Sequence, residues 1–181
     1  MYNLFLTAPS GTGKSTIIEK ILCRLNVPIG GFQVKRYLNK KGKMYFDMIS
    51  VVDGKGNNLI GECINNKNII PNLYTFENKG VEILNTSLTN SDLITLDEIG
   101  FLEENAEKFK SSVRNVLNSN KVVLEVLKEF DSPFLNEIRS RKDITLLNVT
   151  LKNRDYITNH ILNILSNWNI PMKFYENEMI P

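Results

Sequence analysis

Cysteine is scarce in this sequence, with only Cys23 and Cys63 among 181 residues. The two have no partner spacing for a zinc site, and Cys23 falls within an apolar helical pattern, where a buried thiol is the common state. Their scarcity favours a reducing, cytoplasmic setting. A chain of 181 residues can bury a sizeable core without disulfides or structural metal, so we expect one domain over 1–181.

The sequence also lacks a charge imbalance and a long hydrophobic run. Its 22 Lys and Arg residues and 20 Asp and Glu residues leave a net charge of +2, with no long basic run. This balance indicates neither a nucleic-acid partner nor an anionic membrane. Nowhere do about eighteen apolar residues follow one another, and the apolar start at 2–6 lacks the basic flank and the length of a signal peptide. No membrane association is therefore expected.

Short apolar runs and helical patterns make up the first part of the chain. A strand is expected at 4–6, followed by a glycine loop and a helix from Ser15 whose apolar residues recur at helical spacing. Strand-forming residues at 32–38 and 44–52, with turn residues between them, predict a β-hairpin. The Gly- and Asn-rich segment 53–79 is expected to form loops with short strand pieces.

The second part of the chain alternates helices and strands. We expect helices at 81–88, 104–117, 133–141 and 155–165, strands at 93–96, 122–127 and 144–149, and an irregular docked tail after Trp168. Such alternation predicts an α/β fold of three layers, in which helices cover both faces of a mostly parallel sheet and a β-hairpin is added after the first helix.

The loop after the first strand matches the Walker A spacing of P-loop proteins, with alanine in place of the first glycine. Its residues are Ala8, Pro9, Ser10, Gly11, Thr12, Gly13, Lys14 and Ser15. The backbone N–H groups of such a loop, together with the positive end of the following helix, bind phosphate. We expect Lys14 to reach the β- and γ-phosphates, Ser15 to coordinate Mg²⁺, and Thr16 to touch the α-phosphate.

Two other interpretations of this loop are an ordinary glycine turn and a Rossmann dinucleotide loop. The Rossmann interpretation lacks a third glycine at Thr16. The strand before the loop and the helix after it favour phosphate binding over a plain turn.

An acidic pair follows the apolar run 93–96. Asp97 occupies the Walker B position, where a carboxylate can hold Mg²⁺ alongside Ser15. Glu98 is placed to orient or deprotonate a water for in-line attack on the γ-phosphorus, which favours hydrolysis over mere binding. A surface pair that caps the next segment is the alternative.

The same segment fits the D-x-x-G spacing of switch GTPases, in which the amide of Gly100 would meet the γ-phosphate. The Asn-Lys-x-Asp motif that usually reads guanine is missing. ATP and GTP therefore both remain open as substrates.

Basic residues near the predicted strand ends are further candidates. Arg154 follows the last predicted strand, where its guanidinium could approach phosphate and neutralise transition-state charge; a salt bridge at the start of the helix is the alternative. Arg139 and Arg141 could form a lid over phosphates, although a solvated helix end explains them better. His160 lacks metal-ligand spacing and is expected to be structural or on the surface.

On these motifs the chain resembles the small nucleoside-triphosphatases, a P-loop family described as thermophilic or cancer-related. The resemblance lies in the loop 8–15, in Gly30-Gly31-Phe32, in Asp97-Glu98-Ile99-Gly100 with Glu103 close behind, and in Val149-Thr150 leading to Asn153-Arg154-Asp155. It implies a RecA-like P-loop fold, slow hydrolysis of several nucleoside triphosphates to the diphosphate and phosphate, and magnesium dependence. After Gly-Phe, where such proteins often carry an acidic pair and an arginine, this chain has Gln33-Val34-Lys35-Arg36.

Three functions remain in competition: a nucleoside-triphosphatase, a nucleotide or nucleoside kinase, and a nucleotide-gated binding module. In the third, the hairpin contacts a partner, as Lys35-Arg36 and the turn at 39–43 suggest. Glu98 places hydrolysis first, because a kinase must keep water away from the γ-phosphate. The expected substrate is a nucleoside triphosphate, with Mg²⁺ as cofactor.

Overall fold

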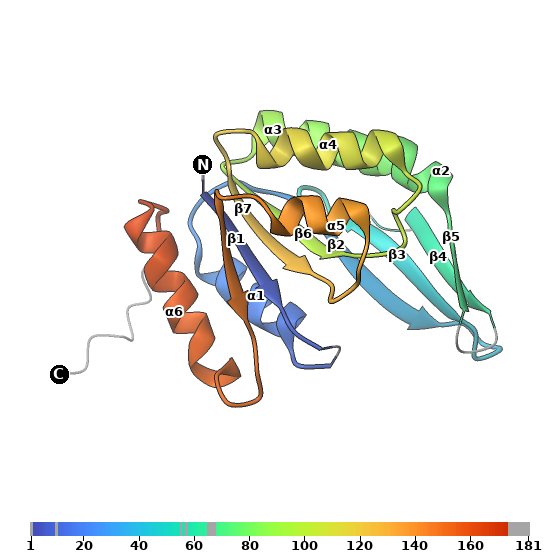
Figure 1. The fold of residues 1–181 in the computed structure, drawn as a ribbon, viewed down its shortest axis with the longest axis horizontal. Coiled ribbons are helices and arrows are strands. Elements are labelled where there is room, and N and C mark those ends of the chain that lie inside the picture. Colours follow the sequence, from blue (N-terminus) through green and yellow to red (C-terminus); the bar gives the residue numbers. More distant parts are fainter. Residues whose placement is uncertain (1, 10, 55, 57, 65–67, 174–181) are drawn as a thin grey trace.

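One sheet runs through the molecule in the computed structural model, which describes residues 2–9, 11–54, 56, 58–64 and 68–173. Within these residues the sheet has eight strands in the order β5-β4-β3-β2-β6-β7-β1-β8 (Figure 1). The strands are β1 (Tyr2–Thr7), β2 (Ile29–Leu38), β3 (Met44–Ser50), β4 (Asn58–Ile64), β5 (Asn68–Pro71), β6 (Leu93–Ile99), β7 (Val122–Leu127) and β8 (Ile144–Asn148).

The sheet is parallel on one side and antiparallel on the other. Strands β8, β1, β7, β6 and β2 run parallel, whereas β2, β3, β4 and β5 pair antiparallel in succession. The hairpin predicted after the first helix is therefore present as β2 and β3. It continues into β4 and β5, where we expected only loops with short strand pieces. The Gly and Asn residues of this segment do not indicate strands in the sequence, because β4 is stabilised by pairing with β3, and β5 by pairing with β4, rather than by local propensity.

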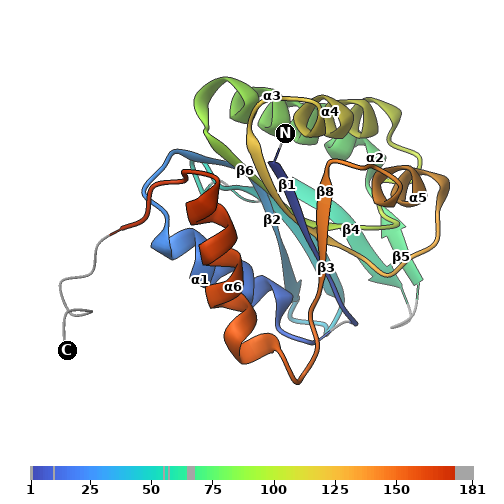
Figure 2. The ribbon, with the colours of Figure 1, turned by 60° about the vertical axis from the view of Figure 1, so that its left-hand side comes forward.

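Helices cover both faces of the sheet, as the alternating pattern predicted. They are α1 (Lys14–Arg24), α2 (Leu73–Thr75), the π-helical turn η1 (Phe76–Gly80), α3 (Val81–Asn90), α4 (Glu107–Leu117), α5 (Pro133–Arg139) and α6 (Arg154–Asn167). One face carries α1 and α6, and the other carries α3, α4 and α5 (Figures 1 and 2). No helix in the described part of the chain is long and apolar enough to cross a membrane.

Two separate clusters of buried apolar side chains join these layers. One packs α3, α4 and α5 onto the sheet around Phe5 and Phe109. The other packs α1 and α6 onto the opposite face around Leu4 and Ile21. All six residues of β7 are buried, which is typical of a central parallel strand covered on both faces.

Local packing explains where the structure departs from the predicted helices. The helix expected at 81–88 begins earlier, because α2 and η1 lead into α3 without a break and Asn72 caps the start at the backbone N–H of Thr75. A Cβ atom at Gly80 would lie 2.7 Å from Cδ2 of Phe109, so glycine there allows this segment to approach α4 closely. Cys23 is exposed, so the expectation of a buried thiol was wrong.

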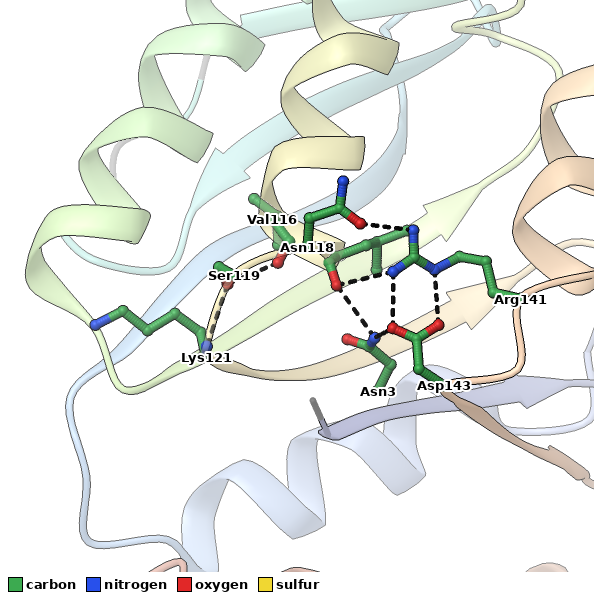
Figure 3. A network of polar contacts seen from close by, with 8 residues as sticks. Asn3, Val116, Asn118, Ser119, Lys121, Arg141 and Asp143 are labelled. Carbon is green, nitrogen blue, oxygen red and sulfur yellow. Dashed lines mark hydrogen bonds and ion pairs between the residues drawn. The ribbon is translucent and has the colours of Figure 1, made fainter.

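A polar network fixes the amino ends of β1 and β8 (Figure 3). The guanidinium of Arg141 contacts both carboxylate oxygens of Asp143, at 3.0 and 2.7 Å, and donates to the backbone O of Leu117 at 3.1 Å. The Asn3 amide donates to the same carbonyl and to Asp143 Oδ2. These bonds tie the end of α4 to both strands, at the sheet end opposite to the loop that follows β1.

Candidate active site

The loop between β1 and α1 has a left-handed backbone at two of its glycines. Gly11 and Gly13 adopt φ angles of 81° and 95°, in the left-handed region that glycine enters most readily. Gly13 caps α1, so Lys14 is the first residue of that helix. The loop therefore leads into a helix N-terminus, which favours an anion. Ser10, expected to bind phosphate, lies outside the described residues.

Lys14 is held inside its own loop. Its Nζ donates to the backbone O of Ala8 at 2.6 Å and to that of Pro9 at 3.0 Å, and Thr12 Oγ1 donates to the latter oxygen at 2.5 Å. Burial lowers the pKa of Lys14, while the nearby Glu98 carboxylate opposes this shift. The ammonium therefore has two carbonyl partners that phosphate oxygens can replace.

Asp97 lies near the carboxyl end of β6 and is almost fully buried. Its Oδ2 accepts a hydrogen bond from the backbone N–H of Val34 at 3.2 Å, whereas its Oδ1 has no hydrogen-bond partner among the described residues. Burial raises the pKa of Asp97 to about 6. A buried carboxylate with one unpartnered oxygen is chemically suited to a cation. The described residues contain no group of three or more His, Cys, Asp or Glu side chains that could hold a metal, so a metal here would also need phosphate or water ligands.

Glu98 interrupts the regular ladder of β6. Its φ of 64° is left-handed, and the register between β6 and β7 shifts between Leu96 and Ile99. The Glu98 carboxylate forms an ion pair with Lys128, in which Nζ and Oε1 are 3.4 Å apart. Glu98 is the residue expected to orient the attacking water. Strained backbone conformations of this kind are common at functional sites.

A pocket of about 230 Å³ brings the loop and Glu98 together. Its lining comprises Gly11, Gly13, Lys14, Ser15, Thr16, Val34, Arg36 and Glu98. Arg36 was not among the expected site residues, because we had linked Lys35 and Arg36 to a partner of the hairpin. The strand β2 continues past its last pairing with β6, at Phe32, and this extension carries Arg36 to the pocket.

A second pocket, of about 480 Å³, lies against the other side of the loop. It is lined by Pro9, Gly11, Thr12, Glu129, Asn148, Val149, Thr150 and Leu151. Asn153 holds this segment after β8: its Oδ1 accepts from the backbone N–H of Thr150 at 2.7 Å, and its Nδ2 donates to the backbone O of Asn148 at 2.8 Å. Asn153, the first residue of the Asn-Arg pair, thus shapes the wall of a pocket beside the loop.

Gly100 and Glu103 form a contact within the site region. The amide of Gly100, expected to meet the γ-phosphate, donates to Glu103 Oε1 at 2.5 Å. Burial raises the pKa of Glu103 to about 7, with the Gly100 amide opposing the shift. The role of Gly100 at the γ-phosphate stays a prediction, and that amide has another acceptor in this structure.

The three other candidate arginines, Arg139, Arg141 and Arg154, line neither of the two loop pockets. The Nε of Arg154 is 3.5 Å from Oδ1 of Asp155, the helix-start ion pair that was the alternative. Its catalytic role stays a prediction. Arg139 donates to the backbone O of Lys128 and of Phe130, and Arg141 belongs to the network of Figure 3. Neither arginine forms a lid over the loop.

The chain is similar to known proteins over most of its length. A protein-family model described as NTPase matches residues 3–162. Nucleoside-triphosphatase THEP1 of Thermotoga maritima is 31% identical over 166 residues, which cover 90% of this chain and 94% of that protein. The human cancer-related nucleoside-triphosphatase is 27% identical over 175 residues, covering 86% and 92%.

A solved structure has a similar fold. The crystal structure of THEP1 from the hyperthermophile Aquifex aeolicus superimposes with a TM-score of 0.75 at 26% sequence identity. The match covers 91% of this chain and 99% of that one.

Proposed function

This chain belongs to the NTPase family whose model matches residues 3–162, and on that premise we propose that it hydrolyses nucleoside triphosphates to the diphosphate and phosphate. The likeness to the THEP1 structure confirms the P-loop fold predicted from the sequence. The observation that carries the proposal is the pocket of about 230 Å³, because the Walker A loop and the Glu98 carboxylate line the same space.

The triphosphate would bind along the loop from Ala8 to Thr16. Backbone N–H groups of the loop and the start of α1 donate to the phosphate oxygens. Lys14 exchanges its bonds to the Ala8 and Pro9 carbonyls for bonds to the β- and γ-phosphates. A buried ammonium with a lowered pKa has lost hydration that the phosphates can replace, which supports this exchange.

Family membership implies a divalent metal associated with the nucleotide, and we propose Mg²⁺. Ser15 and Asp97 would hold it, and the unpartnered Oδ1 of Asp97 supports that choice. When bound, Mg²⁺ supplies positive charge to the β- and γ-phosphate oxygens.

Glu98 would act on the attacking water. Its carboxylate accepts a proton as the water oxygen bonds to the γ-phosphorus, and the electron pair of the breaking P–O bond stays on the β-phosphate. Lys14 stabilises the negative charge that develops on the phosphates. We expect Arg36, which lines the same pocket, to add positive charge there.

The nucleoside would lie in the pocket of about 480 Å³ beside the loop. Its walls combine backbone groups of the segment after β8 with the apolar side chains of Pro9 and Leu151, a composition that can accept more than one base. We therefore propose ATP and GTP as substrates, with other nucleoside triphosphates also accepted. We further propose that the protein is cytoplasmic and that residues 1–181 form a single domain.

The structure gives the kinase alternative little support, since Arg139 and Arg141, its candidate lid residues, are bonded elsewhere. The binding-module alternative relied partly on Arg36 as a contact for a partner, but Arg36 lines the pocket of about 230 Å³ beside the loop, which weakens that alternative.

Phosphate release from ATP, GTP, CTP and UTP, with and without Mg²⁺, tests the proposal. We expect Mg²⁺-dependent release by the wild type. The substitution Glu98→Gln should lower kcat about a hundredfold or more, because general-base catalysis contributes on that order. Nucleotide binding should persist in this variant.

Glu82→Gln is the matched control, because Glu82 is an exposed carboxylate on α3 whose side chain is 64% accessible. It should leave kcat unchanged. Equal rates for wild type and Glu98→Gln would remove Glu98 from the mechanism.

A further inference from the structure

Lys128 is a cation beside the proposed site that none of the sequence motifs contains. It directly follows β7, the strand between β6 and β1. Its backbone is fixed on both sides: its N–H donates to the backbone O of Ile99 at 3.0 Å, and its carbonyl accepts from Arg139 Nη2 at 2.6 Å. The start of the side chain is therefore held in place next to the end of β6.

The Lys128 side chain runs over Gly100 towards Glu98. A Cβ atom at Gly100 would lie 2.6 Å from Lys128 Cδ, so a glycine at that position leaves room for the aliphatic chain. The ammonium lies 4.8 Å from the centre of the Phe101 ring, a favourable cation–π distance. These contacts direct Nζ to Glu98 Oε1.

The pair between Lys128 and Glu98 is loose. Its 3.4 Å separation exceeds the roughly 2.7–2.9 Å of a tight charge-assisted hydrogen bond. Both side chains are partly exposed, at 26% for Lys128 and 20% for Glu98. A competing anion can therefore take Lys128 from this carboxylate at modest cost.

Lys128 also lies within electrostatic range of the Walker A lysine. Burial is the main cause of the lowered pKa of Lys14, and the charge of Lys128 adds to that lowering. Glu98 interacts with both cations. A γ-phosphate bound by Lys14 would bring up to about two negative charges into the region between these two lysines.

We propose that Lys128 exchanges its ion-pair partner when a triphosphate binds, moving from the Glu98 carboxylate to the γ-phosphate and so freeing Glu98 to accept the proton of the attacking water. This inference rests on the proposed hydrolysis and deepens it, because it makes Lys128 the residue that distinguishes a triphosphate from a diphosphate. With a diphosphate bound, the γ-phosphoryl group is absent and Lys128 stays on Glu98. The carboxylate is then released for catalysis only when the substrate is complete.

The first test compares two affinities in the full chain: that for a nucleoside diphosphate and that for a non-hydrolysable triphosphate analogue of the same base. Lys128→Met, which keeps most of the side-chain length and loses the charge, should lower the preference for the triphosphate analogue about tenfold or more. Diphosphate affinity should stay nearly unchanged. Lys128→Arg should retain most of the preference, and Lys142→Met, an exposed lysine before β8, should behave as wild type.

The substitution Glu98→Gln provides a second, independent test. This variant removes the competitor for Lys128, so its preference for the triphosphate analogue should rise, and the further change Lys128→Met should abolish that rise. The proposal is overturned if Lys128→Met weakens diphosphate and triphosphate binding equally, or raises kcat, or if Glu98→Gln leaves the preference unchanged.

These affinities are measured without turnover. Failure of the proposed hydrolysis is a different result, seen as wild-type phosphate release that is absent or insensitive to Glu98→Gln.

Discussion

At the scale of single residues, Asp97 shows a conflict between stability and the proposed function. Its pKa of about 6 means that the folded carboxyl holds its proton more tightly than the unfolded chain, whose value is 3.8. The stability associated with that proton is complete below pH 3.8 and is lost as the pH rises through about 6. At neutral pH the protein therefore keeps a buried charge that its fold does not need.

We expect Asp97→Asn to raise the free energy of unfolding of the nucleotide-free protein by on the order of 2 kcal/mol at pH 8. The gain should disappear near pH 4, where the wild-type side chain is also neutral. Urea unfolding at the two pH values measures this change. The same variant should lose metal-dependent hydrolysis. Asp92→Asn, at an exposed position before β6, is the control and should change neither quantity; an equal gain at both pH values would contradict the account.

At the scale of elements, the close approach of β2 to β6 and α3 positions the site. Gly31 has a φ of 96°, and a Cβ atom there would lie only 1.8 Å from the backbone O of Thr95. Its N–H donates to Ser87 Oγ of α3 at 2.7 Å. Three residues further along β2, the backbone N–H of Val34 reaches Asp97. The Gly-Gly-Phe segment thus places β2 where it can hold the Asp97 carboxylate.

Gly31→Ala should therefore destabilise the protein by about 3 kcal/mol or more, since it combines a backbone clash with an unfavourable φ. Gly42→Ala is the matched control: Gly42 has a φ of 75°, but no heavy atom lies within 4 Å of a Cβ placed there. Its cost should be only about 1 kcal/mol, from the φ angle alone. Chemical unfolding of both variants measures the difference. Similar losses would show that the close approach contributes little.

At the scale of the whole molecule, buried carboxyls make stability depend on pH. Glu125 lies in the middle of β7 with no exposed surface, and neither of its carboxylate oxygens has a hydrogen-bond partner among the described residues. Burial, followed by the nearby Glu103, raises the pKa of Glu125 well above its usual value. Burial also raises the pKa of Glu103 from 4.5 to about 7. Above about pH 4.5, both carboxyl groups therefore keep protons in the folded state that the same groups of the unfolded chain have released.

The free energy of unfolding should therefore fall as the pH rises from about 4.5 through about 7, because the unfolded chain binds fewer protons than the folded one in this window. Glu125→Gln removes one of the two titrating groups. It should reduce the fall and stabilise the protein at pH 8 relative to wild type. Denaturant unfolding at several pH values measures both effects, with the exposed Glu82→Gln as control. A pH slope that is the same in Glu125→Gln and wild type would contradict this interpretation.

The sequence by itself determined the features that depend on neighbours along the chain. The loop at 8–15, its flanking strand and helix, and the acidic pair after the strand at 93–96 could all be identified from residue type and spacing. The fold class followed from the alternation of strands and helices. Each is a local pattern, because backbone geometry over a few residues decides whether glycine, an apolar run or a cap fits.

Only the tertiary structure decided which distant residues meet. Arg36 reaches the pocket of about 230 Å³ because β2 continues beyond its last pairing with β6, and Lys128 reaches Glu98 because β7 lies beside β6. The strands β4 and β5 are held by pairing with the strand before each of them, and this pairing extends the sheet beyond the predicted hairpin. The charged environment of a side chain is a sum over neighbours in space, so spacing in the sequence does not contain it.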